Sequence, residues 1–314
     1  MRSQTVEYFS GRQRVRALWR TPDTDGPYRA IIQGPGWYGL KDAKDYDRYH
    51  QAFTAAGFAV LSIDYRGFGE SEGERGIVDP NSQLDDLING VTYLTTRDDV
   101  LGGAIGAYAT GGTGGGNVVL LAAADPRVRA VISQVPVADG RDWLHRMRTE
   151  WEWIEYQREL EEDRRRRVLT GESKLVHPRE EIMVQTPERR ATGFKKDVDG
   201  KNPTAVPLAM VDPLLRYRPL DAARGLRTPL LVIAVDRDAT TPTDHAEAIY
   251  QAAVGPKKFI LQRNSSHYAA YNAYADVITP EMTAWFDEHL TPTGDLTVIS
   301  HPGTAAAAPK NLGE

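Results

Sequence analysis

Short apolar segments alternate with amphipathic segments through the first part of the chain. The segments Ala30–Gln33 and Phe58–Tyr65 are apolar with glycines beside them, which predicts two buried strands. Residues 45–57, between them, have helical spacing and end in a glycine, and a second apolar face follows Pro80. The next segments are predicted as strand, helix and strand: 104–110, 116–125 and 128–136. This alternation predicts an α/β fold with a mostly parallel sheet and helices on both faces.

The alternation stops near Asp139 and resumes at Thr228–Asp236, followed by residues 257–262. A last helix is expected over residues 279–290, with Thr279 as its cap and a proline in its first turn. The predicted organisation has three parts: an α/β core over 1–138 and 223–290, an inserted helical lid over 139–222, and a C-terminal tail over 291–314, which is an arm or disordered.

Composition narrows the class of function. Of the 314 residues, 41% are hydrophobic. The net charge of −5 gives no sign of the basic surface that binds nucleic acid or an anionic membrane. The absence of cysteine excludes disulfides, thiolate catalysis and cysteine metal sites. No stretch reaches the ~20 apolar residues of a membrane span, and the N-terminus has no signal-peptide core, so a cytoplasmic protein is expected.

Three separated motifs carry candidate chemistry. A glycine-rich turn, GGTGGG over Gly111–Gly116, lies between a predicted strand and a predicted helix, where hydrolases place a nucleophile in the pattern G-x-S-x-G. The segment VIAVDRDATTP ends a later strand with two aspartates, and SSHYAAY places His267 in a loop before the last helix. The order of nucleophile, acid and histidine is that of an α/β-hydrolase triad, but the turn contains no serine.

With these motifs, the chain resembles the α/β-hydrolase superfamily, in the group of X-prolyl-peptidase-like, acetyl-esterase-like and polyketide-pathway hydrolases. The resemblance runs from Val6 to about Leu290. The segments that carry it are GPGWYGLKD, GFAVLSIDYRGFGESEGE, AAADPRVRAVISQVP, DRDATTP and SSHYAAYNAYADVITPEMTAWFDEHL. The resemblance implies that Asp238 is the acid, with Asp236 as the fallback, and that His267 is the base. It also implies that the backbone N–H of Trp37 is an oxyanion donor.

Two registers of the glycine-rich turn compete. Read as G-x-T-x-G, the turn places Thr113 at the nucleophile position and adds the N–H of Gly114 to the oxyanion hole. Read from the helix that follows, it places Gly112 there and leaves no hydroxyl at the tip. A β-branched residue at positive φ costs about 1–3 kcal/mol and glycine does not, which favours the second register for the backbone. Thr113 is retained because it has the only hydroxyl that fits the pattern.

The expected function is hydrolysis of an ester, thioester or lactone in a small carbonyl compound. A non-hydrolytic lyase, cyclase or isomerase that uses the His–Asp pair as a base, and a ligand-binding protein without turnover, are the alternatives. The expected partner is a small-molecule substrate, and no nucleic acid or membrane is expected. The sequence leaves open whether the protein forms a homodimer. No cofactor and no metal are expected. The aromatic residues expected to bind substrate are Tyr38, Trp151, Trp153, Tyr156 and Tyr268.

Overall fold

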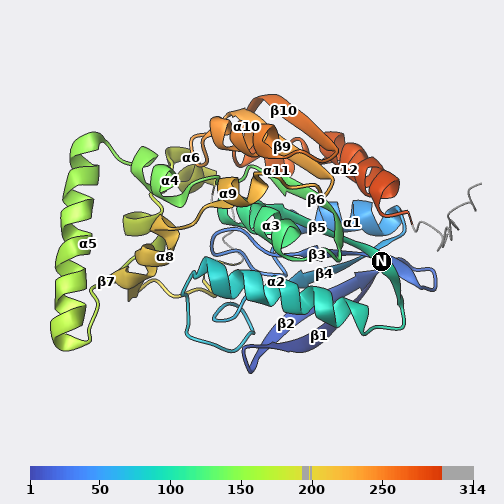
Figure 1. The fold of residues 1–314 in the computed structure, drawn as a ribbon, viewed down its shortest axis with the longest axis horizontal. Coiled ribbons are helices and arrows are strands. Elements are labelled where there is room, and N and C mark those ends of the chain that lie inside the picture. The colour runs from blue at the N-terminus through green and yellow to red at the C-terminus, as the bar shows by residue number, and fades with distance from the viewer. Residues whose placement is uncertain (193–197, 199, 292–314) are drawn as a thin grey trace, which may run out of the picture.

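An eight-stranded sheet forms the centre of the protein (Figure 1). The computed structural model describes residues 1–192, 198 and 200–291. The strand order is β1-β2-β4-β3-β5-β6-β9-β10. The strands are β1 (Arg2–Ser10), β2 (Gln13–Thr21), β3 (Tyr28–Gln33), β4 (Phe58–Ile63), β5 (Val100–Thr110), β6 (Val128–Gln134), β9 (Leu230–Arg237) and β10 (Lys257–Ser266). From β4 to β10 every neighbouring pair is parallel, so the predicted fold class is confirmed.

The sheet also contains an N-terminal hairpin that the apolar pattern did not indicate. Strands β1 and β2 pair antiparallel with each other, and β2 pairs antiparallel with β4. The connecting turn is Gly11-Arg12, and both residues have positive φ, 54° and 67°. A two-residue turn with two positive φ angles matches the twist of a hairpin. The hairpin therefore adds an antiparallel edge to an otherwise parallel sheet.

Helices cover both faces of the sheet. On one face α1 (Asp47–Ala55) and α12 (Ala275–His289) pack over a core that includes Phe53, Phe58 and Phe286. The other face is covered by α2 (Pro80–Thr95), α3 (Gly112–Ala124) and α10 (Thr243–Ala252). Because both faces are buried, the central strands are apolar throughout rather than alternating.

The last helix begins earlier than predicted. The sequence analysis placed Thr279 as its cap, whereas α12 begins at Ala275 and contains Pro280 in its interior. The residues before the proline, Ala275 and Ile278, are buried against the sheet. Burial of these side chains stabilises an additional helical turn. This stabilisation offsets the loss of the one backbone hydrogen bond that a proline cannot donate.

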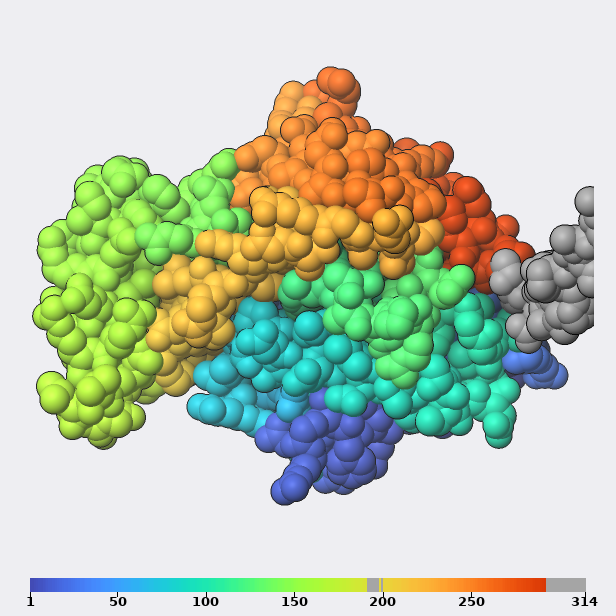
Figure 2. Space-filling view, in the orientation of Figure 1, coloured from blue at the N-terminus to red at the C-terminus, as the bar shows by residue number. Residues whose placement is uncertain are grey.

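The described residues of the long segment between β6 and β9 contribute no strand to the eight-stranded sheet. Its elements are α4 (Gly140–Arg146), α5 (Glu150–Thr170), β7 (Leu175–Val176), the π-helical turn η2 (Pro178–Ile182), α6 (Pro187–Thr192), β8 (Val206–Pro207), η3 (Leu208–Met210), α8 (Val211–Leu215) and α9 (Pro219–Ala223). Figure 1 shows α5 standing at one end of the molecule, and the space-filling view shows the segment as a lobe there (Figure 2). The predicted insertion falls within this segment, and the predicted tail lies outside the described residues except for Thr291. None of the described helices is long and apolar enough to cross a bilayer.

Candidate active site

The turn between β5 and α3 has its sharpest point at Gly111. This residue has φ 86° and ψ 152°, a region that glycine alone adopts readily. Its N–H donates to the carbonyl of Gln134 (3.2 Å), and its own carbonyl accepts from Gly115 (2.7 Å) as α3 begins. The tip of the turn therefore lies one residue before Gly112 and two before Thr113, and it has no side chain.

A second backbone loop approaches this turn closely. A Cβ built on Gly36 would lie 2.7 Å from the carbonyl oxygen of Thr110, and one built on Gly114 would lie 3.0 Å from the nitrogen of Gly36. Both positions therefore require glycine. The loop is anchored by Lys41, whose backbone N–H and Nζ donate to Asp64 at 2.8 and 2.7 Å. Gly36 precedes Trp37, the predicted oxyanion donor, so the close approach brings that residue to the mouth of the turn.

Asp238 and His267 are hydrogen-bonded, as the sequence analysis expected. His267 Nδ1 lies 2.8 Å from Asp238 Oδ2, and the two side chains are 6% and 1% exposed. Asp238 Oδ1 also accepts from the backbone N–H groups of Thr240 (2.8 Å) and Thr241 (2.7 Å), which fixes the carboxylate. An ionised Asp238 holds the proton of His267 on Nδ1 and leaves Nε2 as the acceptor. The fallback residue, Asp236, instead accepts from backbone N–H groups at the end of β10.

The other nitrogen of His267 contacts a tyrosine that the sequence analysis did not identify. The hydroxyl of Tyr271 lies 2.8 Å from His267 Nε2, and the side chain is buried. Burial raises the pKa of Tyr271 well above its usual value, so its hydroxyl stays protonated and donates to Nε2. A Cβ built on Gly111 would lie 3.6 Å from this hydroxyl. Acid, histidine and tyrosine therefore form a chain of hydrogen bonds that ends beside the tip of the turn.

The spacing of the histidine and the tyrosine was the available signal. Tyr271 lies four residues after His267 and falls in the short helix α11 (Ala269–Asn272). His267 lies just before this helix, and a helix continued back to it would place the two residues on one face, because residues four apart share a face. Tyr268 and Tyr271 are three residues apart, and both of their rings pack edge-on against His267. The segment was too short to predict as a helix from its pattern alone.

A small cavity of about 30 Å³ lies at the end of this hydrogen-bonded chain. Its described lining residues are Trp37, Gly111, Gly112, Trp143, Arg179, Met183, Arg189, Thr240, Thr241, His267, Tyr268 and Tyr271. Four of them, Trp143, Arg179, Met183 and Arg189, belong to the segment between β6 and β9. A cavity of this size holds about two water molecules as it stands. That segment therefore forms part of the described wall of the cavity.

Of the three candidate residues in the turn, Gly112, Thr113 and Gly114, only Gly112 is among the described lining residues of the cavity. Gly112 lines the cavity, and a Cβ there would lie 2.8 Å from Val137 Cγ2. Thr113 is buried in the first turn of α3, where its carbonyl accepts from the hydroxyl of Tyr217 (2.9 Å), and it is not among the described lining residues. Gly114 packs on the backbone of Gly36 instead of facing the cavity. Because the tip lies at Gly111, both sequence registers place it too late in the chain.

Of the five predicted substrate-binding aromatics, Tyr268 is the one that lines the cavity. Tyr38 donates its hydroxyl to the carbonyl of Gly76 (2.6 Å) and packs on Phe68 within the core. The three residues of α5 lie elsewhere: Trp151 is 66% exposed, while Trp153 and Tyr156 are buried and contact each other. None of these three residues is among the described lining residues of the cavity. The described insertion residues that reach the cavity come from α4, η2, α6 and the residues between them.

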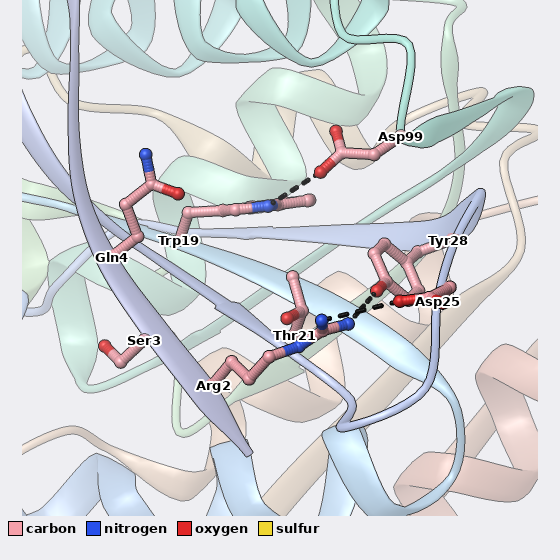
Figure 3. Close-up of a pocket in the computed structure, with 9 residues that line it drawn as sticks. Arg2, Ser3, Gln4, Trp19, Thr21, Asp25, Tyr28 and Asp99 are labelled. Carbon is pink, nitrogen blue, oxygen red and sulfur yellow. Dashed lines mark hydrogen bonds and ion pairs between the residues drawn. The ribbon is translucent and has the colours of Figure 1, made fainter.

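A wider hollow of about 400 Å³ lies at the opposite end of the strands (Figure 3). Its polar groups bond to one another: Trp19 Nε1 donates to Asp99 (3.2 Å), and Arg2 donates to the hydroxyl of Tyr28 (2.7 Å). Tyr28 begins β3 and Asp99 precedes β5, whereas the cavity beside His267 lies at the carboxyl ends of the strands. Ligands of parallel α/β sheets bind at the carboxyl ends, so this hollow is not the candidate site. Within the described part of the chain, no three His, Asp or Glu side chains form a group that could hold a metal ion.

Comparisons with known proteins show the family and the fold of the chain. A model of the X-Pro dipeptidyl-peptidase (S15 family) matches residues 11–269. The chain is 29% identical over 281 residues to an uncharacterized 31.7 kDa protein in the traX-finO intergenic region of Escherichia coli, covering 88% of this chain and 96% of that one. It is 27% identical to the thiohydrolase aneE of Aspergillus aculeatus, covering 78% and 80%. The solved structure of the α/β hydrolase GrgF from Penicillium sp. sh18 superposes with a TM-score of 0.76 at 20% identity, covering 92% and 99%, and shows the same fold.

Proposed function

Because the chain belongs to the X-Pro dipeptidyl-peptidase (S15) family and is an α/β-hydrolase-type enzyme, we propose that it hydrolyses a small ester, thioester or lactone by direct attack of water. The observation that carries the proposal is the hydrogen-bonded chain Asp238–His267–Tyr271, which ends beside Gly111. The position at the tip of the turn has no side chain, and water takes the place of a nucleophilic residue. The similarity to a thiohydrolase supports an acyl substrate.

In this mechanism His267 is the general base. A water molecule in the cavity gives a proton to the oxygen of Tyr271 as the tyrosine proton passes to His267 Nε2. Asp238, bonded to Nδ1, stabilises the imidazolium that forms, and the water oxygen bonds to the substrate carbonyl carbon. When the intermediate collapses, the alkoxide or thiolate leaves and takes a proton back through Tyr271. The products are a carboxylic acid and an alcohol or thiol.

Backbone N–H groups at the mouth of the turn stabilise the oxyanion. The N–H of Gly112, the first residue of α3, has no acceptor within the helix, because the first residues of any helix lack one. Gly112 and Trp37 both line the cavity, and each donor of this kind contributes about 10²- to 10³-fold in rate. This assignment keeps Trp37 and replaces Gly114 with Gly112, since Gly114 packs on Gly36.

The proposal is tested with the purified chain and one activated ester, one acyl thioester and one lactone. We expect turnover of at least one class, a linear time course without a burst, and no acyl group on the protein in intact-mass spectra of the quenched reaction. An acyl adduct on Tyr271 would show that the tyrosine, and not water, attacks the carbonyl. Absence of turnover with all three classes would contradict hydrolysis and favour a ligand-binding protein or a non-hydrolytic enzyme.

The substitution Thr113→Val tests the role of the threonine hydroxyl in the turn. Valine keeps the shape of this buried side chain and removes only the hydroxyl. Because Thr113 lies outside the described lining of the cavity, we expect kcat/KM to change by no more than about threefold. The measurement is steady-state hydrolysis of the best substrate class. A loss of several orders of magnitude would restore Thr113 as the nucleophile.

A further inference from the structure

Two arginines line the same cavity as His267. Arg179 belongs to η2 and Arg189 to α6, and they are 7% and 4% exposed. A guanidinium group keeps its positive charge at all ordinary pH values. Both arginines lie on the described wall together with His267, which Asp238 holds from its far side. Two guanidinium groups therefore lie on the described wall of the cavity that contains the proposed base.

Each arginine is attached to an element of the proposed catalytic site. Arg179 Nη2 donates to the carbonyl oxygens of Trp37 and Tyr38, both at 3.3 Å. Arg189 follows Glu188, whose carboxylate accepts from the hydroxyl of Ser266 at 2.5 Å, and Ser266 precedes His267. One arginine is thus positioned by the proposed oxyanion loop and the other by the histidine loop.

Both positive charges act on a single phenol beside the base. Burial, the larger effect, raises the pKa of Tyr268, while the charges of Arg189 and Arg179 lower it. The ring of Tyr268 packs edge-on against His267, with centroids 5.0 Å apart. The two guanidinium groups therefore act over the part of the cavity nearest to the histidine.

We propose that the substrate carries a carboxylate close to its reactive carbonyl, and that Arg179 and Arg189 bind that carboxylate. This inference rests on the proposed function and names its substrate class as monoesters and monothioesters of short dicarboxylic acids. Arginine matches a carboxylate through paired N–H donors.

The experiment compares two esters that differ in one charge. These are 4-nitrophenyl hydrogen glutarate and its neutral partner, 4-nitrophenyl methyl glutarate. We expect the wild-type protein to prefer the charged ester by at least about tenfold in kcat/KM, the effect of one hydrogen bond to a charged group. Glutarate alone is expected to bind in isothermal titration calorimetry and to compete with the charged ester.

The variants Arg179→Met and Arg189→Met keep the length of the buried side chain and remove its charge. Each is expected to reduce the preference for the charged ester by at least about tenfold, and Arg179→Lys is expected to retain part of it. The matched control is Arg158→Met on α5, where the arginine is 60% exposed and pairs with Glu155, and we expect both esters to react as in the wild type.

The outcomes separate this inference from the proposed function. Equal kcat/KM for the two esters overturns the carboxylate site and leaves hydrolysis standing. Turnover of neither ester, with glutarate binding that depends on the arginines, overturns hydrolysis and supports the carboxylate site. Absence of both turnover and glutarate binding overturns both. Inhibition by inorganic phosphate at lower concentrations than by glutarate overturns the carboxylate as the bound group.

Discussion

Replacing His267 with glutamine is expected to lower kcat/KM by about 10²- to 10⁴-fold, the contribution of a positioned general base. Glutamine fills much of the space of the imidazole and can still accept the hydrogen bond from Tyr271, but it cannot take up a proton. The side chain of His267 is 6% exposed, so this replacement disturbs the packing less than alanine would. The measurement is hydrolysis of the best ester or thioester, with the melting temperature recorded for each variant.

His145→Gln is the matched control for this substitution. His145 lies on α4, stacks on Trp153 and bonds to Glu150, and it is absent from the described lining of the cavity. We expect its replacement to leave kcat/KM unchanged within about threefold. If His267→Gln kept wild-type turnover with an unchanged melting temperature, the reaction would have to be assigned to another part of the molecule.

The second large effect is expected for Tyr271→Phe. This change removes the hydroxyl that lies between the cavity and His267 Nε2 and leaves the buried ring in place. Because the proposed proton path runs through that oxygen, we expect kcat to fall by about 10²-fold or more, with a smaller change in KM. The measurement is the pH–rate profile, in which loss of the relay lowers the maximal rate across the whole range.

Tyr49→Phe provides the control for removal of a buried tyrosine hydroxyl. Tyr49 is fully buried, and its hydroxyl donates to the carbonyl of Ala270 at 3.1 Å, so the same chemical change is made outside the cavity. A loss of activity in Tyr271→Phe that tracks a loss of stability, with equal losses in Tyr49→Phe, would indicate a structural role. A faster Tyr271→Phe variant would indicate that the hydroxyl only occupies the water position and must be displaced.

The sequence was sufficient to predict that the acid and the histidine follow two successive strands. Asp238 follows a predicted apolar strand, and His267 follows the next one. Consecutive parallel strands bring their carboxyl ends to one edge of the sheet, so two residues placed there by local patterns come together. For the same reason the alternation of strands and helices was sufficient to predict the central sheet. The N-terminal hairpin was not predicted, because its two strands mix polar and apolar residues and its turn depends on positive φ angles at Gly11 and Arg12.

The register of the glycine-rich turn depends on contacts between distant segments. Its sequence holds five glycines around one threonine and contains no local marker of the tip. The tip is set where β5 stops pairing with β6: Thr110 is aligned with Gln134, and the next N–H, that of Gly111, still donates to the carbonyl of Gln134. A strand end defined by its partner cannot be located from the strand alone.

What the sequence by itself determined is therefore the fold class, the parallel core and the positions of the acid and the histidine, because these follow from periodicities and from motifs at strand ends. Only the tertiary structure decided three further features: the glycine at the tip, Tyr271 as the partner of Nε2, and the two arginines in the cavity wall. Tyr271 lies in a helix of four residues, too short to form without packing. Arg179 and Arg189 come from short elements more than 60 residues after Gly111, and folding of that segment over the sheet brings their charges to the base.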